Sequence, residues 1–500
     1  MSVEAGRTPI RFGTDGWRAV IARDFTFENL ERVARGYATY IQIEHGKTLP
    51  GDSPEINTSP TDPIARRSSP FVIIGYDRRF LSERFAMRVA EVLADNGIEV
   101  SMFDRDMPTQ LVSWAVREHG AAGGVMITAS HNPPDFNGFK IKAPWGGSAT
   151  PETTSAVEAL VDANGPVRAA FVKNSVFANN QESHLEASVA SYRQQVKSFV
   201  DIDRLQSLRA HVVVDPMHGT GGRWVESFLA NGALQVETIR ADRDPLFGGV
   251  NPEPIDQNLA PLRMRVQETG ALVGLATDGD ADRLGAVDEQ GRTMTMHEVV
   301  PLVLLHLARN RKMSGGVIRT FSQSVLLKRI AAAHNLPLYD TPIGFKYIAD
   351  LMLRENILVG AEESGGIGVQ GHIPERDGIL NSLLFLEAIA TAGKPPSEMV
   401  KEMHQEFGEF YFGRRDLHTE VARGQNLVAS LAASPPASVA GYKVQGVATL
   451  DGTKLLLDDE SWLLFRQSGT EPMLRIYSEA TSSAKVQALL DQGCTYAQTL

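Results

Sequence analysis

Short apolar runs alternate along this chain with longer stretches in which apolar residues recur at helical spacing. Apolar runs of about four to eight residues bounded by Gly, Asp or Ser are typical of buried strands, and the amphipathic stretches between them of helices. This alternation predicts α/β units. The predicted strands are Phe71–Gly75, Ile98–Phe103, Gly124–Thr128, His211–Asp215, Leu234–Ile239, Ala271–Thr277, Leu284–Val287, Gly316–Arg319 and Ile357–Gly360.

The predicted helices fall between those strands, and the pattern changes near the C-terminus. From about Phe410 we expect shorter strands and one closing helix, Ser482–Gln492, which indicates a smaller α+β domain. A chain of 500 residues has room for about three or four domains with sizeable cores. The predicted helices are Phe27–Ile43, Arg84–Asn96, Thr109–Glu118, Ser188–Phe199, Arg223–Ala230 and Ile379–Ala392.

The composition is that of a soluble globular protein, with 43% hydrophobic and 22% charged residues. A net charge of −11 disfavours a general binder of nucleic acids or membrane surfaces. The single cysteine, Cys494, cannot form an internal disulfide, which fits a reducing compartment. No apolar run reaches the length of a membrane span, and the first residues lack the apolar core of a signal peptide. We therefore expect a cytoplasmic protein.

Three carboxylates recur at every second residue in Asp278, Asp280 and Asp282, directly after a predicted strand. Like charges this close repel one another unless a cation lies between them, and oxygen ligands select a hard cation such as Mg²⁺. The simpler alternative is a solvated acidic turn. A helix–loop–helix calcium site is disfavoured because Arg283 occupies the sixth position, where such a loop needs Gly, and because the flanks read as strands.

Ser130 stands in a second loop after a strand, in the segment Thr128–Pro134 (TASHNPP). A hydroxyl at the end of a strand, flanked by His131 and Asn132, is a candidate nucleophile or phosphate carrier. Ser, Asn and Pro also form ordinary turns, so a simple turn is the alternative. Lys140 follows and could supply a cation or relay a proton, although a lone lysine usually faces solvent.

Two further loops combine glycine with polar side chains. Arg466–Pro472 (RQSGTEP) joins a guanidinium, two hydroxyls and a glycine, a set that suits a phosphate group, with Arg475 as a second cation. Its alternative is a hairpin turn. Glu362 and Ser364 lie in a glycine-rich segment (GAEESGG) and could bind sugar hydroxyls, or form an exposed acidic turn.

Taken in order, these loops resemble the signatures of the α-D-phosphohexomutase family. They span nearly the whole chain: Phe12–Arg18 (FGTDGWR), the serine loop at Ser130, the metal loop at Asp278–Asp282, the sugar loop at Glu362–Ser364 and the phosphate loop at Arg466–Pro472. The resemblance implies an α/β fold with four domains around a central cleft, three related α/β units and a smaller C-terminal α+β domain. The expected domains are 1–187 with the phosphoserine loop, 188–297 with the metal loop, 298–409 for sugar specificity and 410–500 for phosphate binding.

The resemblance also implies a role for individual residues. Ser130 would carry a phosphoryl group, and Mg²⁺ would bind that group together with Asp278, Asp280 and Asp282. Catalysis of phosphoryl transfer depends mainly on positioning and charge neutralisation, which a metal and cations provide. The expected catalytic residues are Ser130, His131, Lys140 and Arg18. The expected substrate-binding residues are Arg283, Gly344, Lys346, Glu362, Ser364, Arg376, Arg466, Ser468, Gly469, Thr470 and Arg475.

Members of the family differ in their sugar. Phosphoglucosamine mutases end the sugar loop in His, as do some phosphomannomutase/phosphoglucomutases, whereas this chain has Gly366 and looks more like phosphoglucomutase. The expected reaction interconverts glucose 1-phosphate and glucose 6-phosphate through glucose 1,6-bisphosphate. The alternatives are a phosphomannose or phosphopentose mutase, or a non-catalytic binder of sugar phosphates or divalent cations. Without the histidine, Lys140 is the first choice for proton transfer, and Arg376 is expected to act electrostatically because arginine does not readily release a proton.

Overall fold

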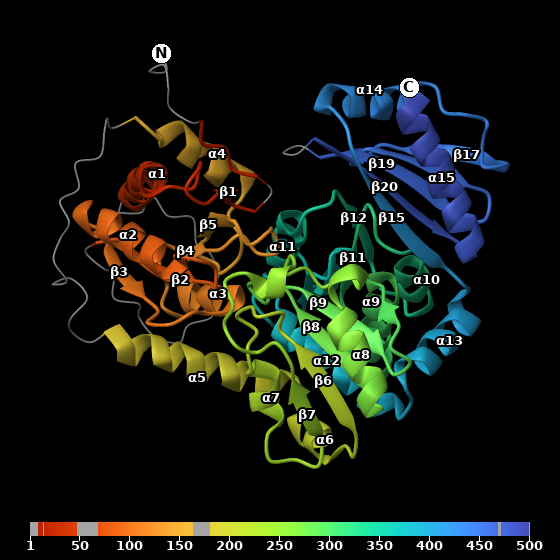
Figure 1. Cartoon of the computed structure of the whole chain (residues 1–500), viewed down its shortest axis with the longest axis horizontal. Coiled ribbons are helices and arrows are strands. Elements are labelled where there is room, and N and C mark those ends of the chain that lie inside the picture. The colour runs from red at the N-terminus through yellow and green to blue at the C-terminus, as the bar shows by residue number, and fades with distance from the viewer. Residues whose placement is uncertain (1–8, 14, 48–68, 164–180, 469–471, 500) are drawn as a thin grey trace.

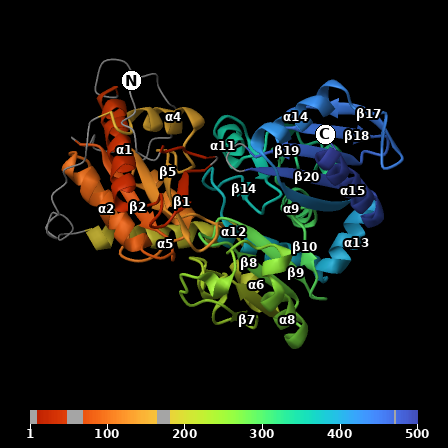
Figure 2. The same cartoon turned by 45° about the horizontal axis from the view of Figure 1, so that its top comes forward.

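Four sheets follow one another along the chain, and each forms the centre of one structural unit, numbered I to IV in chain order (Figure 1). The computed structural model describes residues 9–13, 15–47, 69–163, 181–468 and 472–499. Units I and IV lie at opposite ends of the molecule, with units II and III between them (Figure 2). The expected α/β fold with a distinct C-terminal unit is confirmed, whereas the residue boundaries given above stay a prediction.

Units I, II and III are α/β units built from the predicted strands and some that the pattern did not reveal. Unit I contains β1 Trp17–Val20, α1 Phe27–Lys47, β2 Phe71–Tyr76, α2 Ser82–Asp95, β3 Glu99–Met102, α3 Thr109–Glu118, β4 Gly123–Ile127, β5 Phe136–Lys142 and α4 Pro151–Leu160. Unit II contains α5 Gln181–Phe199, α6 Ile202–Ser207, β6 His211–Asp215, α7 Trp224–Leu229, β7 Gln235–Thr238, α8 Ala260–Thr269, β8 Val273–Thr277, β9 Leu284–Asp288 and β10 Thr293–Met294. Unit III contains α9 Met296–Leu305, β11 Gly316–Thr320, α10 Val325–Ala333, β12 Leu338–Thr341, α11 Phe345–Arg354, β13 Ile357–Ala361, β14 Ile367–Val369, α12 Gly378–Ala392 and α13 Pro396–Phe407.

One strand order is repeated in these three units. It reads β3–β2–β4–β5 in unit I, β7–β6–β8–β9 in unit II and β12–β11–β13–β14 in unit III. In each case the first three strands of the set are parallel and the fourth is antiparallel. The turn between the third and fourth strands is the serine loop in unit I, the aspartate loop in unit II and the Glu362 loop in unit III. Equivalent positions of three related units therefore carry three of the predicted site loops.

Unit IV is an antiparallel sheet in the order β15–β20–β19–β18–β17–β16. The expectation of shorter strands was wrong, since β15 and β20 have 8 residues each. The expected closing helix is present as α15, and a second helix, α14, was not expected. The helix α14 escaped prediction because its sequence, VARGQNLVASLAA, mixes apolar residues with weak helix formers such as Gly and Asn. The elements are β15 Tyr411–His418, α14 Val421–Ala433, β16 Ser438–Val439, β17 Tyr442–Ala448, β18 Thr453–Leu457, β19 Trp462–Gln467, β20 Met473–Ala480 and α15 Ser483–Thr499.

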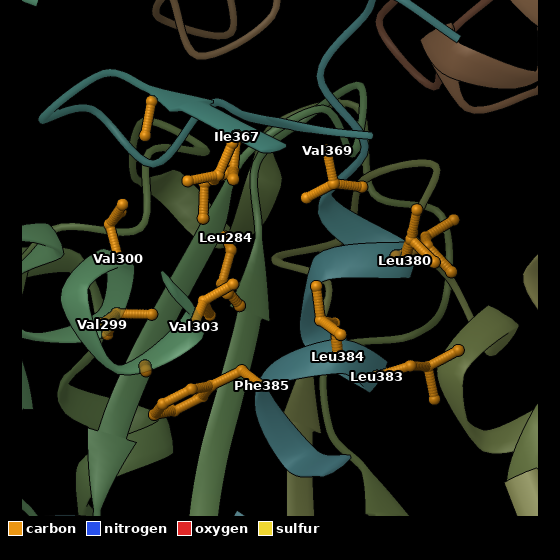
Figure 3. Packing of buried hydrophobic residues seen from close by; sticks show 14 of the residues in the cluster. Leu284, Val299, Val300, Val303, Ile367, Val369, Leu380, Leu383, Leu384 and Phe385 are labelled. Atoms are coloured by element: carbon orange, nitrogen blue, oxygen red, sulfur yellow. The ribbon is translucent and has the colours of Figure 1, made fainter. Parts of the chain in front are cut away.

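A continuous apolar core joins the units and fixes the loops relative to one another. One buried cluster includes Ile73 of unit I, Val212 of unit II, Val317 of unit III and Trp462 of unit IV. Figure 3 shows its central part, where Leu284 of β9 lies among side chains from α9, β14 and α12. Within the described ranges, no helix is both long and apolar enough to cross a membrane.

Candidate active site

Ser130 occupies a strained position at the end of β4. Its φ of +52° lies in the left-handed region, where a side chain is unfavourable, and its backbone N–H donates to Oγ1 of Thr128 at 2.9 Å. The hydroxyl is buried and donates to Oδ2 of Asp278 at 2.8 Å. The Nδ1 atom of His131 lies 3.4 Å from the same Oγ. The serine loop of unit I and the aspartate loop of unit II therefore meet at this hydroxyl.

The side chain of Arg79 holds the serine loop in place, a role that its local sequence did not indicate. Its guanidinium is buried and donates at 2.6–3.0 Å to the carbonyl oxygens of Ser130, Asn132, Pro133 and Phe136. It forms an ion pair with the buried Asp77 at 3.3 Å and lies 5.0 Å from the ring centre of Phe247 in unit II. Burial raises the pKa of Asp77 although the charge of Arg79 opposes this. The sequence indicated only that a loop follows β2. It did not indicate that Arg79 contacts the segment around Ser130.

The three aspartates of the predicted metal loop are buried together. One oxygen from each of Asp278, Asp280 and Asp282 lies within 4.8 Å of the others. Asp278 Oδ1 accepts from the backbone N–H groups of Asp282 and Arg283, which turns the loop around it. The Oδ1 atoms of Asp280 and Asp282 are buried without a hydrogen-bond partner among the described residues. Burial raises the pKa of Asp278, and the charges of Asp282 and Asp280 raise it further. Such clustered, unsatisfied oxygens fit a hard divalent cation.

Two buried cations form ion pairs with these carboxylates. Lys140 on β5 is buried, with its Nζ 2.8 Å from Asp280 and 2.9 Å from Asp15. Arg376 lies 2.8 Å from Asp282 and 2.6 Å from the same Asp15. Burial lowers the pKa of Lys140, but the neighbouring carboxylates outweigh it and the pKa is raised. Lys140 is therefore held charged, which suits charge neutralisation and does not test its predicted part in proton transfer.

Arg18 and Arg283 are two arginines whose charges act on the imidazole of His131, next to Ser130. Arg18 donates to Oδ1 of Asn132 in the serine loop at 2.6 Å, and Arg283 lies 3.6 Å from Glu253. Burial lowers the pKa of His131 well below its usual value, and the charges of Arg283 and Arg18 lower it further. The imidazole beside the serine hydroxyl is therefore neutral.

The units meet at this point without a layer of side chains between them. A Cβ atom on Gly279 of the aspartate loop would lie 2.5 Å from the carbonyl oxygen of Ser130. A Cβ atom on Gly378, at the start of α12, would lie 2.4 Å from the carbonyl oxygen of Arg283. Both distances are too short for any side chain, so the main chains of units I, II and III are in direct contact.

The sugar loop of unit III brings Glu362 close to this cluster. Its carboxylate is buried and lies 3.5 Å from Arg376, and its Oε2 has no hydrogen-bond partner in the part of the chain that the structure describes. Burial raises the pKa of Glu362 to about 6, against the opposing charge of Arg376. A carboxyl group that titrates near neutral pH can transfer protons. Glu362 is thus a second candidate for that task, which the sequence did not single out. Ser364 is half-buried beside it.

Gly344 and Lys346 lie at the N-terminal end of α11 in unit III. Gly344 precedes the helix with a φ of +137°, a conformation that favours glycine. Lys346 lines a pocket of about 160 Å³ against Asp15 and the start of α4 in unit I. The pocket thus adjoins Asp15, the carboxylate that holds Lys140 and Arg376.

Unit IV contributes Arg466 and Arg475 as directly paired residues on β19 and β20. Ser468 follows at the end of β19 and is buried, and its backbone N–H donates to the carbonyl oxygen of Met473. Gly469 and Thr470, which the resemblance also placed in the phosphate loop, lie outside the described residues. The two arginines therefore lie opposite each other at the end of the sheet where the predicted phosphate loop begins.

Comparison with known proteins agrees with this arrangement. Models of phosphoglucomutase/phosphomannomutase match this chain at 63–168 (alpha/beta/alpha domain I), 190–291 (domain II), 296–407 (domain III) and 421–494 (C-terminal domain). A Thermococcus kodakarensis protein named phosphoglucomutase/phosphomannomutase is 31% identical over 483 residues, covering 96% of this chain and 97% of its own. The chain belongs to the α-D-phosphohexomutase family. Enzymes of this family are mutases, so it is an intramolecular phosphotransferase.

Two other relatives show how the sugar varies among phosphohexomutases of similar sequence. The crystal structure of a Thermus thermophilus protein assigned as a phosphomannomutase has 34% identity, a TM-score of 0.81 and covers 98% of this chain and 100% of its own. A phosphoglucosamine mutase of Frankia casuarinae is 29% identical over 485 residues, covering 96% of each chain. Relatives at comparable identity therefore carry names for three different sugars, and overall similarity does not select one.

Proposed function

We propose that this phosphohexomutase is a phosphoglucomutase, which interconverts glucose 1-phosphate and glucose 6-phosphate with Ser130 as the phosphate carrier. The observation that supports this most directly is the hydroxyl of Ser130, buried at the end of β4 and 2.8 Å from Asp278 of the aspartate cluster. A protein that only binds sugar phosphates needs no buried hydroxyl to carry a phosphoryl group. The non-catalytic alternative is thereby disfavoured.

The reaction consists of two transfers through one intermediate. Phosphoserine 130 gives its phosphoryl group to the free hydroxyl of the monophosphate: the serine O–P bond breaks, a sugar O–P bond forms, and the hydroxyl proton goes to a base. The product, glucose 1,6-bisphosphate, reverses its orientation and returns its other phosphoryl group to Ser130. A solved N-acetylphosphoglucosamine mutase of Aspergillus fumigatus, which shares the fold, is described in complex with this bisphosphate.

The residues around Ser130 would neutralise and position the moving group. Asp278, Asp280 and Asp282 would hold Mg²⁺, which when bound supplies positive charge against the phosphoryl oxygens. Lys140 and Arg18 would add fixed positive charge on either side, and His131 would donate to the phosphate rather than carry charge. Lys140, the first proposed proton-transfer residue, is held charged and can therefore only donate a proton, whereas Glu362, whose pKa lies near neutral pH, is the alternative that can accept the hydroxyl proton.

The proposed sugar rests on the end of the sugar loop. A Cβ atom on Gly366 would lie 2.4 Å from the Cδ of Arg376 and 3.1 Å from Oε2 of Glu362. A histidine at this position would therefore displace Arg376, so Gly366 and this arginine form a matched pair that differs from the histidine-ended loop of glucosamine enzymes. Phosphomannomutase is the second candidate, because the Thermus and Thermococcus relatives carry that name.

The proposal is tested by a coupled assay of the purified protein with glucose, mannose, glucosamine and ribose 1-phosphates at saturating Mg²⁺. We expect the highest specificity constant for glucose 1-phosphate. A higher value for glucosamine 1-phosphate would refute the role given to Gly366. A higher value for mannose 1-phosphate would replace glucose by the second candidate.

The role of Ser130 is tested separately by peptide mass spectrometry. Phosphate should be found on Ser130, be lost with excess monophosphate and be restored by glucose 1,6-bisphosphate. Ser130→Ala should fold normally and lose about a thousandfold or more in turnover. Ser227→Ala, an α7 variant remote from the site, is the control and should match the wild type. An exchangeable phosphate on another residue, or near-normal turnover of Ser130→Ala, would show that the mechanism is wrong.

A further inference from the structure

Arg466, the proposed ligand of the substrate phosphate, is itself held by another residue of unit IV. Its Nε donates to Oδ2 of Asp451 at 2.9 Å. Asp451 lies in the turn between β17 and β18, and Gly452 follows it with a φ of +96°. A Cβ atom on Gly452 would lie 2.3 Å from the carbonyl oxygen of Phe465, so this turn packs directly on β19. The position of the Asp451 carboxylate is therefore fixed relative to Arg466.

The same carboxylate oxygen reaches across to unit III. The backbone N–H of Ile343 donates to Oδ2 of Asp451 at 2.9 Å. Ile343 belongs to the segment between β12 and α11, which also contains Gly344 and leads directly into the first turn of α11 with Lys346. One oxygen atom of Asp451 thus joins Arg466 of unit IV to the segment of unit III that precedes α11.

The geometry of the ion pair suits a residue that orients the guanidinium rather than neutralising it. A guanidinium offers five N–H donors in a rigid fork, and the contact with Asp451 uses the Nε side. This contact sets the plane of the guanidinium group. Burial lowers the pKa of Arg466, but Asp451 and its surroundings outweigh it and raise the pKa, so the arginine stays charged. A donor oriented in advance binds an oxyanion with less loss of entropy.

We propose that Asp451 is a positioning residue that couples the two binding segments. It orients Arg466 toward the substrate phosphate and holds the segment 341–346 of unit III against unit IV. The inference rests on the proposed function, because it takes the phosphate of a hexose phosphate as the ligand of Arg466. Losing the carboxylate weakens phosphate binding and loosens the unit III segment together.

Three variants separate these two effects. Asp451→Ala removes both contacts. Asp451→Asn keeps an oxygen that can accept from Ile343 but loses the charge facing Arg466. Asp491→Asn is the matched control, since Asp491 is an exposed aspartate of the same unit that pairs with Arg415 instead.

For Asp451→Ala, we expect KM for glucose 1-phosphate to rise about tenfold, with kcat changed by less than about threefold, the size expected for one partly exposed hydrogen bond to a charged group. Hydrogen exchange of the peptide covering 341–347 in the ligand-free protein should become faster. Asp451→Asn should raise KM about threefold and leave that exchange near the wild-type rate. Asp491→Asn should change neither. In an Arg466→Ala background, Asp451→Ala should add no more than about twofold in KM.

Unchanged hydrogen exchange of the peptide 341–347 in Asp451→Ala would overturn the inference. It would also be overturned if the increase in KM of the double variant equalled the product of the increases in Asp451→Ala and Arg466→Ala, because the two residues would then act independently. Failure of the proposed function is recognised independently, from wild-type protein that converts no sugar 1-phosphate. In that case the exchange measurement and a calorimetric titration with inorganic phosphate decide the inference, because neither needs turnover. Phosphate affinity that is equal in the wild type and Asp451→Ala would then overturn it.

Discussion

Replacing Arg79 with methionine should release the serine loop while leaving the chain folded. Methionine keeps an unbranched apolar stem at this position, but it removes every hydrogen bond that the guanidinium of Arg79 donates. Four carbonyl oxygens around Ser130 then lose their donor, and the buried Asp77 loses its counter-ion. The strained conformation of Ser130, with its φ of +52°, would no longer be stabilised by the hydrogen bonds of Arg79.

The magnitude follows from those losses. Removing one partner of a buried ion pair costs about 3–5 kcal/mol, and each buried acceptor left without a donor adds about 1 kcal/mol or more. Part of this free-energy cost is offset because Asp77 still accepts hydrogen bonds from the hydroxyls of Thr128 and Ser82. We therefore expect unit I to lose about 5 kcal/mol of its free energy of unfolding at pH 8, and kcat to fall about a hundredfold because Ser130 is no longer positioned.

The loss should depend on pH with a definite sign. Burial already raises the pKa of Asp77, and without the charge of Arg79 that pKa rises further. The folded variant then binds a proton that the unfolded chain does not, so its stability falls as pH rises. The stability difference between the wild type and Arg79→Met should consequently be smaller at pH 5 than at pH 8.

Hydrogen exchange of the peptides covering 71–76 and 128–136, with kcat and the phosphate content of Ser130, measures these effects. Arg88→Met is the control: Arg88 is also buried and paired with two glutamates, but it lies on α2 and does not touch the serine loop. It should destabilise unit I less and leave kcat unchanged. If Arg79→Met keeps normal exchange and kcat, or if Arg88→Met lowers kcat equally, the role given to Arg79 is refuted.

Three further predictions concern the metal, the phosphate and the core. Asp280→Asn should fold normally and lose about a hundredfold or more in turnover in a Mg²⁺ titration, and full activity after chelation would exclude the metal. Arg466→Ala should raise KM more than about tenfold and also lower kcat, because remote binding energy is used for orientation. Burial lowers the pKa of His297 to about 3, with the charge of Lys454 adding to it. Between pH 7.5 and 5 the unfolded chain therefore gains a proton and the wild type loses about 2 kcal/mol, a loss that His297→Gln should reduce in urea unfolding.

The order of the loops and most strands could be predicted because both depend on local patterns. β8, for example, is a short apolar run that ends directly at Asp278. The strand β5 was not predicted, although the alternation of polar and apolar residues in FNGFKIK is typical of a half-buried strand. Unlike such a strand, β5 has no exposed polar face, because Lys140 and Lys142 are both buried. Their burial depends on carboxylates from distant segments, Asp280 for Lys140 and Glu375 for Lys142.

The supporting residues could not be predicted for the same reason. Arg79 lies 51 positions before Ser130, and nothing local distinguishes it from the adjacent Arg78. Asp451 is one of many acidic turn residues, and only the packing of β17, β18 and β19 places it beside Arg466. Sequence patterns reveal residues that act through their own loop, whereas residues that act through another loop appear only when the units are assembled.

The direct contact of main chains at Gly279 and Gly378 has a mechanical consequence for a mutase. A bisphosphate that exchanges its two ends needs room to rotate, and main chains in contact at these two points resist separation of units I, II and III. Unit IV is attached differently, through side-chain contacts such as the hydrogen bond from Ser324 to Glu479. We therefore expect unit IV to move more than the other three units when the bisphosphate rotates.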